Sequence, residues 1–123
     1  MKIYFLAIFA AAGTLAVFFA ATPALPHAFP LRAEPRVGST VADPPPKVTI
    51  WFDGEIESTF SKIEVYDADK RRVDKNHVRL DTPRTKLEVD LPPLPPGKYQ
   101  VHWTVLSVDT HVTEGQFNFT VGK

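Results

Sequence analysis

The sequence contains no cysteine, and its only methionine is Met1. These two absences exclude disulfides, thiolate metal sites, cysteine-attached haem and thiol nucleophiles. They also remove the soft sulfur ligands that hold Cu(I). Any site chemistry in this chain must therefore use His, Asp, Glu and Tyr side chains.

An excess of charge of either sign is also missing, because 14 Lys and Arg residues balance 14 Asp and Glu residues. Such a balance does not produce the broad cationic surface that binds nucleic acid or anionic lipid. A length of 123 residues allows one domain and excludes an enzyme built around a deep interdomain cleft. We therefore expect a small site and no nucleic acid partner.

The first 26 residues contain one charge, Lys2, followed by an apolar run over residues 3–21. This pattern indicates an export signal. The run approaches the roughly 20 residues that span a bilayer, so an uncleaved membrane anchor is the alternative. Small residues and proline after the run favour cleavage.

The position of the cut decides which residue begins the mature chain. Small residues at −1 and −3 favour a cut after Ala24, with Thr22 at −3. A cut after Pro26 frees His27 but places proline at −1, where signal peptidase disfavours it. We predict a signal peptide over residues 1–26, with the cut after 24 or 26 left open, and one domain over residues 27–123.

Apolar and polar residues alternate with a period of two along most of the chain after His27, and twelve prolines provide frequent breaks. No stretch of comparable length shows a helical repeat. The pattern therefore predicts an antiparallel β-sandwich or small barrel, with Trp103, Phe117 and Phe119 in its core. The expected strands are residues 29–34, 47–52, 61–67, a weaker one at 76–80, then 85–91, 97–106 and 113–121.

Asp109 and His111 lie between the two strongest predicted strands. If the backbone is extended through Thr110, side chains two residues apart lie on the same side and the two can converge. The alternative is that Asp109 caps a turn and His111 is half-exposed. Glu114 is either an outer partner of His111 or an ordinary solvated carboxylate. We interpret His77 as a loop residue and His102 as a surface residue opposite Trp103.

His27 offers two nitrogen ligands if it is the first residue of the mature chain. An α-amine with a pKa of ~7.7–8.0 and an imidazole near ~6.5 both lose their protons readily to a metal. With His111 and Asp109 they provide three nitrogens and one oxygen, a set suited to Cu(II) and less strongly to Ni(II) or Zn(II). If Leu25 is first instead, Pro26 has no amide proton, which blocks a terminal chelate through deprotonated amides.

Together these residues resemble the CopC family of periplasmic copper-binding proteins. The resemblance implies an all-β, seven-stranded Greek-key barrel or sandwich of Ig-like type in the periplasm. It also implies that His27, Asp109 and His111 hold Cu(II). The Met-rich loop that gives some members of the family a separate Cu(I) site is missing, so we expect a Cu(II)-only member. The resemblance is carried by His27-Ala28, Pro35-Arg36-Val37-Gly38-Ser39-Thr40-Val41, Tyr99-Gln100-Val101-His102-Trp103, Ser107-Val108-Asp109-Thr110-His111, Gly115, Phe117 and Phe119.

By this resemblance the chain is a monomer for copper carriage, buffering or resistance, without catalytic activity or a small-molecule substrate. Its expected partner is a CopD-like inner-membrane copper transport protein. One alternative is an oxidative copper enzyme, because polysaccharide monooxygenases share the terminal histidine arrangement, but an Asp ligand fills a position that oxygen chemistry needs open. The other is a membrane-anchored sandwich module without metal. Uptake and resistance are not distinguished by the sequence.

Overall fold

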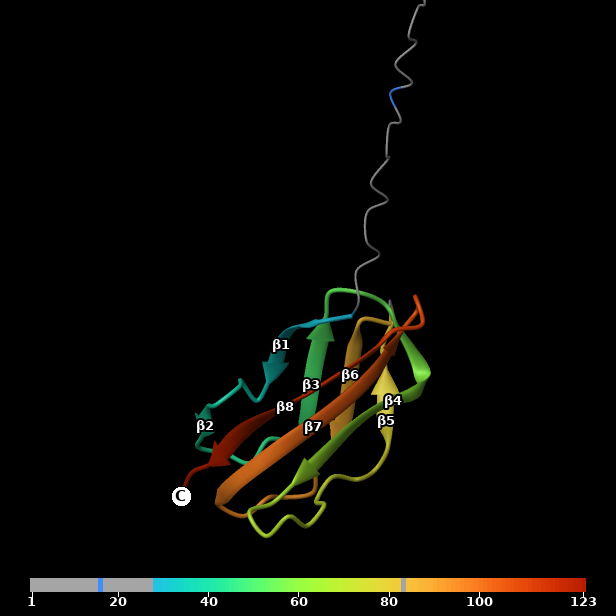
Figure 1. The fold of residues 1–123 in the computed structure, drawn as a ribbon. Helices are drawn as coiled ribbons and strands as arrows, with labels where there is room; N and C mark the ends of the chain where they lie inside the picture. The colour runs from blue at the N-terminus through green and yellow to red at the C-terminus, as the bar shows by residue number, and fades with distance from the viewer. Residues whose placement is uncertain (1–15, 17–27, 83) are drawn as a thin grey trace, which may run out of the picture.

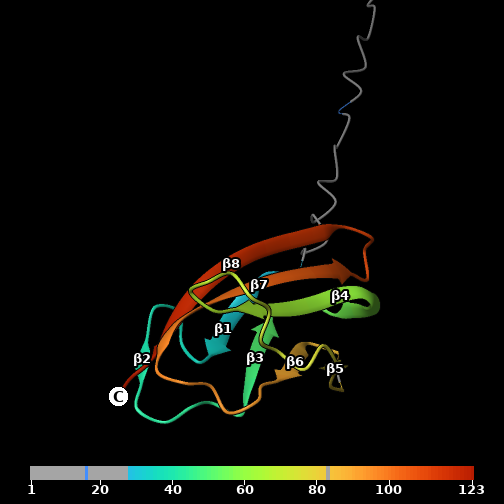
Figure 2. The same ribbon diagram turned by 90° about the horizontal axis from the view of Figure 1, so that it is seen from below.

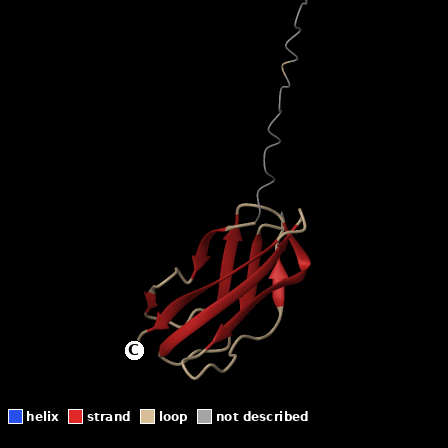
Figure 3. Ribbon diagram, viewed as in Figure 1, coloured by secondary structure: helices blue, strands red, loops and turns tan. Residues whose placement is uncertain are grey.

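The computed structural model describes residue 16, residues 28–82 and residues 84–123. Apart from residue 16, the predicted signal peptide lies outside the described residues, and so does His27. The described part of the chain contains strands and no helix (Figure 3). Accordingly, none of its elements is an apolar helix long enough to cross a membrane.

Eight strands form two four-stranded sheets that face each other (Figures 1 and 2). Sheet A has the order β1-β3-β6-β5 and sheet B has the order β2-β8-β7-β4. The strands are β1 (Pro30–Glu34), β2 (Thr40–Val41), β3 (Lys47–Phe52), β4 (Ile56–Tyr66), β5 (Val78–Leu80), β6 (Lys86–Asp90), β7 (Gly97–Ser107) and β8 (Val112–Val121). The all-β sandwich predicted from the sequence is confirmed.

The core lies between the sheets because most of the alternating apolar residues point inward from their strands. Phe119 is 1% exposed, and Trp103 and Phe117 are each 7% exposed, as predicted. The Trp103 ring meets Phe52 edge to face across the two sheets, with ring centroids 5.4 Å apart. Polar partners of the same strands, such as His102, lie on the outer face.

The strand predictions fail at two places, each for a physical reason. β2 contains two residues and pairs in parallel with Thr120 and Val121, so it depends on a tertiary contact that no local pattern announces. β4 begins at Ile56, five residues before the predicted start. Its pairing with β7 shifts register between Glu57 and Lys62, and this bulge interrupts the alternation.

β7 and β8 form a long antiparallel hairpin whose turn lies at the upper end of sheet B in Figure 1. The first described residues before β1 lie at this same end, and the C-terminus lies at the other (Figure 1). The fold therefore presents the β7–β8 turn and the start of the folded domain on one end of the sandwich.

Candidate metal centre

The β7–β8 turn carries the two described residues predicted to bind metal. β7 ends at Ser107 and β8 begins at Val112, so residues 108–111 close the hairpin. The amide of Thr110 donates to the Ser107 carbonyl at 2.9 Å, and the amide of Ser107 donates to the His111 carbonyl at 2.9 Å. These bonds fix the turn between two strands of a rigid sheet.

The backbone at Thr110 is not extended as predicted, because its φ angle is +72°. A left-handed residue reverses the direction of the chain, so strand alternation is not what brings the two side chains together. The expectation of an extended Thr110 was therefore wrong, although Asp109 and His111 do converge. The turn, and not strand alternation, brings the two side chains together.

Asp109 and His111 form a close pair in which Oδ2 of the carboxylate lies 3.3 Å from Nδ1 of the imidazole. The amide of His111 also donates to Oδ1 of Asp109 at 3.2 Å. The Asp109 side chain is 8% exposed and the His111 side chain is 62% exposed. A nearly buried carboxylate is thus held beneath an accessible imidazole.

Ser107 lowers the pKa of the Asp109 carboxyl group. Its hydroxyl donates a hydrogen bond to Oδ1 of Asp109, and this bond is the main reason why the pKa of Asp109 is lowered to about 2. The amide and the imidazole of His111 lower the pKa further. At neutral pH the pair therefore offers an anionic oxygen beside an imidazole nitrogen, which suits a divalent borderline metal. The sequence analysis placed Ser107 in the motif with Asp109 and His111 but predicted no role for its hydroxyl.

Ala28, the first residue of the described range 28–82, contacts the strand that follows this pair. The hydroxyl of Thr113, two residues after His111, donates to the carbonyl of Ala28 at 2.7 Å. Ala28 is completely buried. His27, the third predicted ligand, is the residue before Ala28 and lies outside the described residues.

The other candidate residues lie elsewhere. His77 is exposed in the loop before β5, and His102 lies on the outer face of sheet B, where Nε2 is 2.7 Å from Oε1 of Gln100. Glu114 is exposed on β8, opposite Thr104. Within the described residues, no three His, Cys, Asp or Glu side chains are grouped closely enough to hold a metal ion.

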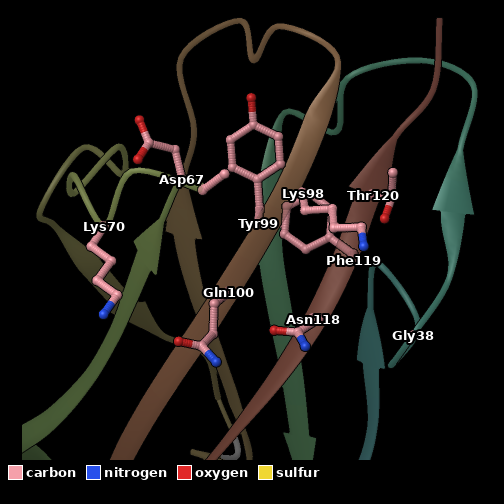
Figure 4. A pocket seen from close by; sticks show the side chains of 10 residues that line it. Gly38, Asp67, Lys70, Lys98, Tyr99, Gln100, Asn118, Phe119 and Thr120 are labelled. Carbon is pink, nitrogen blue, oxygen red and sulfur yellow. The ribbon is translucent and has the colours of Figure 1, made fainter.

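A pocket lies toward the other ends of β7 and β8 (Figure 4). Gln100 and Asn118 extend into it side by side from the two strands, and Lys70 approaches from across the pocket. Neither Asp109 nor His111 lines this pocket. The candidate metal centre and the pocket are separate features of the surface.

A family model for the CopC domain matches residues 31–122. Protein YobA of Escherichia coli strain K12 is 30% identical over 97 residues, which are 77% of this chain and 78% of YobA. Copper transport protein CutJ of Bacillus subtilis strain 168 is 29% identical over 99 residues, which are 79% of this chain. The matched part is only 18% of the length of CutJ.

Two solved structures share the fold. The crystal structure of CopC from Methylosinus trichosporium OB3b has a TM-score of 0.73 and 33% identity, over 78% of this chain and 94% of that one. PcoC, a methionine-rich copper resistance protein from Escherichia coli, has a TM-score of 0.68 and 27% identity. That match covers 78% of this chain and 99% of PcoC.

Proposed function

The chain belongs to the CopC domain family, and from this membership we propose that it is an exported protein that binds one Cu(II) ion and carries or buffers it in the periplasm. The similar proteins CutJ and PcoC are named for copper transport and copper resistance. Copper is thus the cargo of this protein, and its role belongs to copper homeostasis.

The proposed ligands are the amine and imidazole of His27, the carboxylate of Asp109 and the imidazole of His111. The observation that carries the proposal is the Asp109–His111 pair, which holds an anionic oxygen 3.3 Å from an imidazole nitrogen. Its position beside the entry point of the chain supports His27 as the third residue, because Thr113 binds the carbonyl of Ala28. The donor set would be three nitrogens and one oxygen.

This donor set favours Cu(II) over Cu(I). Imidazole, amine and carboxylate groups are hard or borderline ligands, whereas Cu(I) prefers thiolates and thioethers. PcoC is described as methionine-rich, while this chain contains no methionine after Met1. We therefore propose a member of the family that binds Cu(II) alone.

The proposal requires export and processing of the start of the chain. Removal of residues 1–26 would expose the amine of His27 and release the domain from the membrane. A cut after Ala24 would require either further trimming to His27 or a site that uses only side chains, since Pro26 lacks the amide proton of a terminal chelate. Residues 27–123 are then the functional unit.

We also propose a membrane copper transport protein of the CopD type as the partner that receives or supplies the ion. CutJ supports this, because its matching segment is a small part of a longer protein named for copper transport. An exposed His111 imidazole, 62% accessible, leaves one side of the site open for exchange with such a partner.

The proposal is tested by amino-terminal sequencing and copper titration of the exported protein. We expect the mature chain to begin at His27 and to bind one Cu(II). His111→Ala should weaken the affinity by roughly tenfold or more, the scale seen when a metal site loses a supporting group. His77→Ala, which removes an exposed loop imidazole, is the matched control. Unchanged affinity in His111→Ala would overturn the proposed site.

A further inference from the structure

Four residues hold the start of the folded domain between the two sheets. Thr113 of β8 donates its hydroxyl to the carbonyl of Ala28 at 2.7 Å. Asp53, just after β3, accepts the amide of Phe29 through Oδ1 at 2.7 Å and donates its own amide to the Phe29 carbonyl at 2.9 Å. We call this set, Ala28, Phe29, Asp53 and Thr113, the N-terminal anchor.

The anchor ties Ala28 to sheet B and Phe29 to sheet A. Thr113 pairs with Val105 in the hairpin, so its hydroxyl has a fixed position two residues from His111. Ala28 is completely buried, and its carbonyl therefore needs a protein partner. Residue 27 is joined to Ala28 by one peptide bond.

We propose that Thr113 is a positioning residue for copper binding, which sets the affinity by holding residue 27 beside Asp109 and His111. This inference rests on the proposed function, because it assumes that His27 supplies ligands. Thr113 does not itself contact the ion. Its contribution is to fix the point from which the terminal residue reaches the β7–β8 turn.

The physical basis is preorganisation. Ligands from two distant segments bind one ion tightly only if the segments are already close, since the cost of ordering a loose segment is subtracted from the binding free energy. A terminal residue on an anchored chain has a high effective concentration at the site. Without the Thr113 hydroxyl, Ala28 is still joined to Phe29 by the peptide bond, but it loses its hydrogen bond to β8, the strand that follows His111.

Thr113→Val tests this, because valine has nearly the same shape and lacks the hydroxyl. We expect the mature exported protein with Thr113→Val to bind Cu(II) roughly threefold to tenfold more weakly, the equivalent of one net hydrogen bond. Thr113→Ser should restore the affinity. Thr104→Val, the same change on the neighbouring strand β7, is the matched control and should leave the affinity unchanged.

A double-mutant cycle separates positioning from general destabilisation. The second background removes both ligands of residue 27, through His27→Ala with the terminal α-amine acetylated. In that background Thr113→Val should change Cu(II) affinity by less than twofold, because no terminal ligand remains to be positioned. An equal loss in both backgrounds would overturn the inference.

Hydrogen exchange provides a readout without copper. The amide of Phe29, which donates to Asp53, should exchange at least threefold faster in metal-free Thr113→Val than in the parent or in Thr104→Val. Unchanged exchange together with unchanged affinity would overturn the anchor's role and leave the proposed function standing. A parent protein that binds no Cu(II), or binds it independently of His27, would overturn the proposed ligand set and this inference with it.

Discussion

The hydroxyl of Ser107 donates a hydrogen bond to the carboxylate of Asp109 from the last residue of β7. Ser107 is 2% exposed, and its Oγ also lies 3.0 Å from the main-chain oxygen of His111. The serine thus contacts both residues of the candidate pair from within the sheet. The orientation of the carboxylate is set by a rigid strand as well as by the turn.

Removing this hydroxyl should change the ionisation of Asp109. In Ser107→Ala we expect the pKa of Asp109 to rise from about 2 toward its ordinary value of 3.8, because the hydrogen bond to the charged form is lost. A carbon-detected NMR titration of the metal-free protein measures this directly. Ser39→Ala, whose hydroxyl donates to the Arg36 carbonyl, should leave the Asp109 pKa unchanged.

The sign of the pH effect follows from the lowered pKa. Asp109 contributes stability above its unfolded-state pKa of about 3.9, and this contribution is lost as the pH falls toward 2. In Ser107→Ala this contribution should be smaller, because the folded-state pKa of Asp109 then lies closer to its unfolded-state value. An Asp109 pKa that stays near 2 in this variant would show that Ser107 is not the cause of the shift.

Gly115 should not accept a side chain. A Cβ at this position would lie 2.6 Å from a ring carbon of Trp103, which is 7% exposed and packed against Phe52. Because an aromatic ring in a closed core cannot yield freely, Gly115→Ala should lower the free energy of unfolding by roughly 1–3 kcal/mol. Urea denaturation measures the change.

The control for this prediction is Gly122→Ala. There the nearest heavy atom to the added Cβ is the Val41 carbonyl oxygen at 3.4 Å, which needs little adjustment. We expect a smaller loss of stability than in Gly115→Ala. Equal losses in the two variants would mean that the Trp103 contact is not the source of the effect.

Much of the fold could be predicted because its strands are long and regularly patterned. β3 and the pair β7 and β8 were predicted to within one residue at each end, since burial of one face imposes a period of two. β2 could not be predicted, because its pairing with Thr120 and Val121 exists only after the chain has folded. The bulge in β4 hid its first residues for a related reason.

The site was predictable in its residue types and not in its geometry. Asp109 and His111 stood out because two metal-binding side chains lie close together in a loop between strong strands. Their actual convergence depends on the positive φ angle of Thr110 and on the Ser107 hydroxyl, and neither has a signature in a single sequence. His27 lies outside the described residues, so its role stays a prediction.

Asp74 should be important for stability although it lies in an exposed, highly charged loop. Its side chain is fully buried and accepts the amides of Val65 and Asn76, each at 2.8 Å, and the guanidinium of Arg72 at 2.9 Å. Burial alone would raise the pKa of Asp74, but these donors outweigh it and lower the pKa. Asp74→Ala should lower the free energy of unfolding by roughly 1–3 kcal/mol at pH 7, since the amide of the buried residue Val65 is left without its acceptor.

The pH dependence distinguishes this effect from a simple loss of packing. A carboxylate with a lowered pKa stabilises the fold above its unfolded pKa of about 3.9 and loses that contribution as the pH falls through its folded pKa. The difference between the parent and Asp74→Ala in urea denaturation should therefore be larger at pH 7 than at pH 3. Asp69→Ala, at an exposed position of the same loop, should have little effect at either pH. A difference independent of pH would contradict the electrostatic account.

Thr110 occupies a backbone conformation that is unfavourable for a β-branched residue, with a φ angle of +72°. Glycine adopts this region without steric cost, and the left-handed conformation costs other residues roughly 1–2 kcal/mol. Glycine also increases the entropy of the unfolded chain, and this offsets part of the stability gained by relieving the strained conformation. Thr110→Gly should therefore raise the free energy of unfolding by roughly 0.5–1 kcal/mol, whereas Thr110→Ala, which keeps a Cβ, should not. Cu(II) affinity should stay within twofold of the parent, because the Thr110 amide still donates to the Ser107 carbonyl and the His111 amide still donates to Oδ1 of Asp109. Lower stability in Thr110→Gly than in Thr110→Ala would show that the threonine side chain stabilises the turn more than its conformation costs.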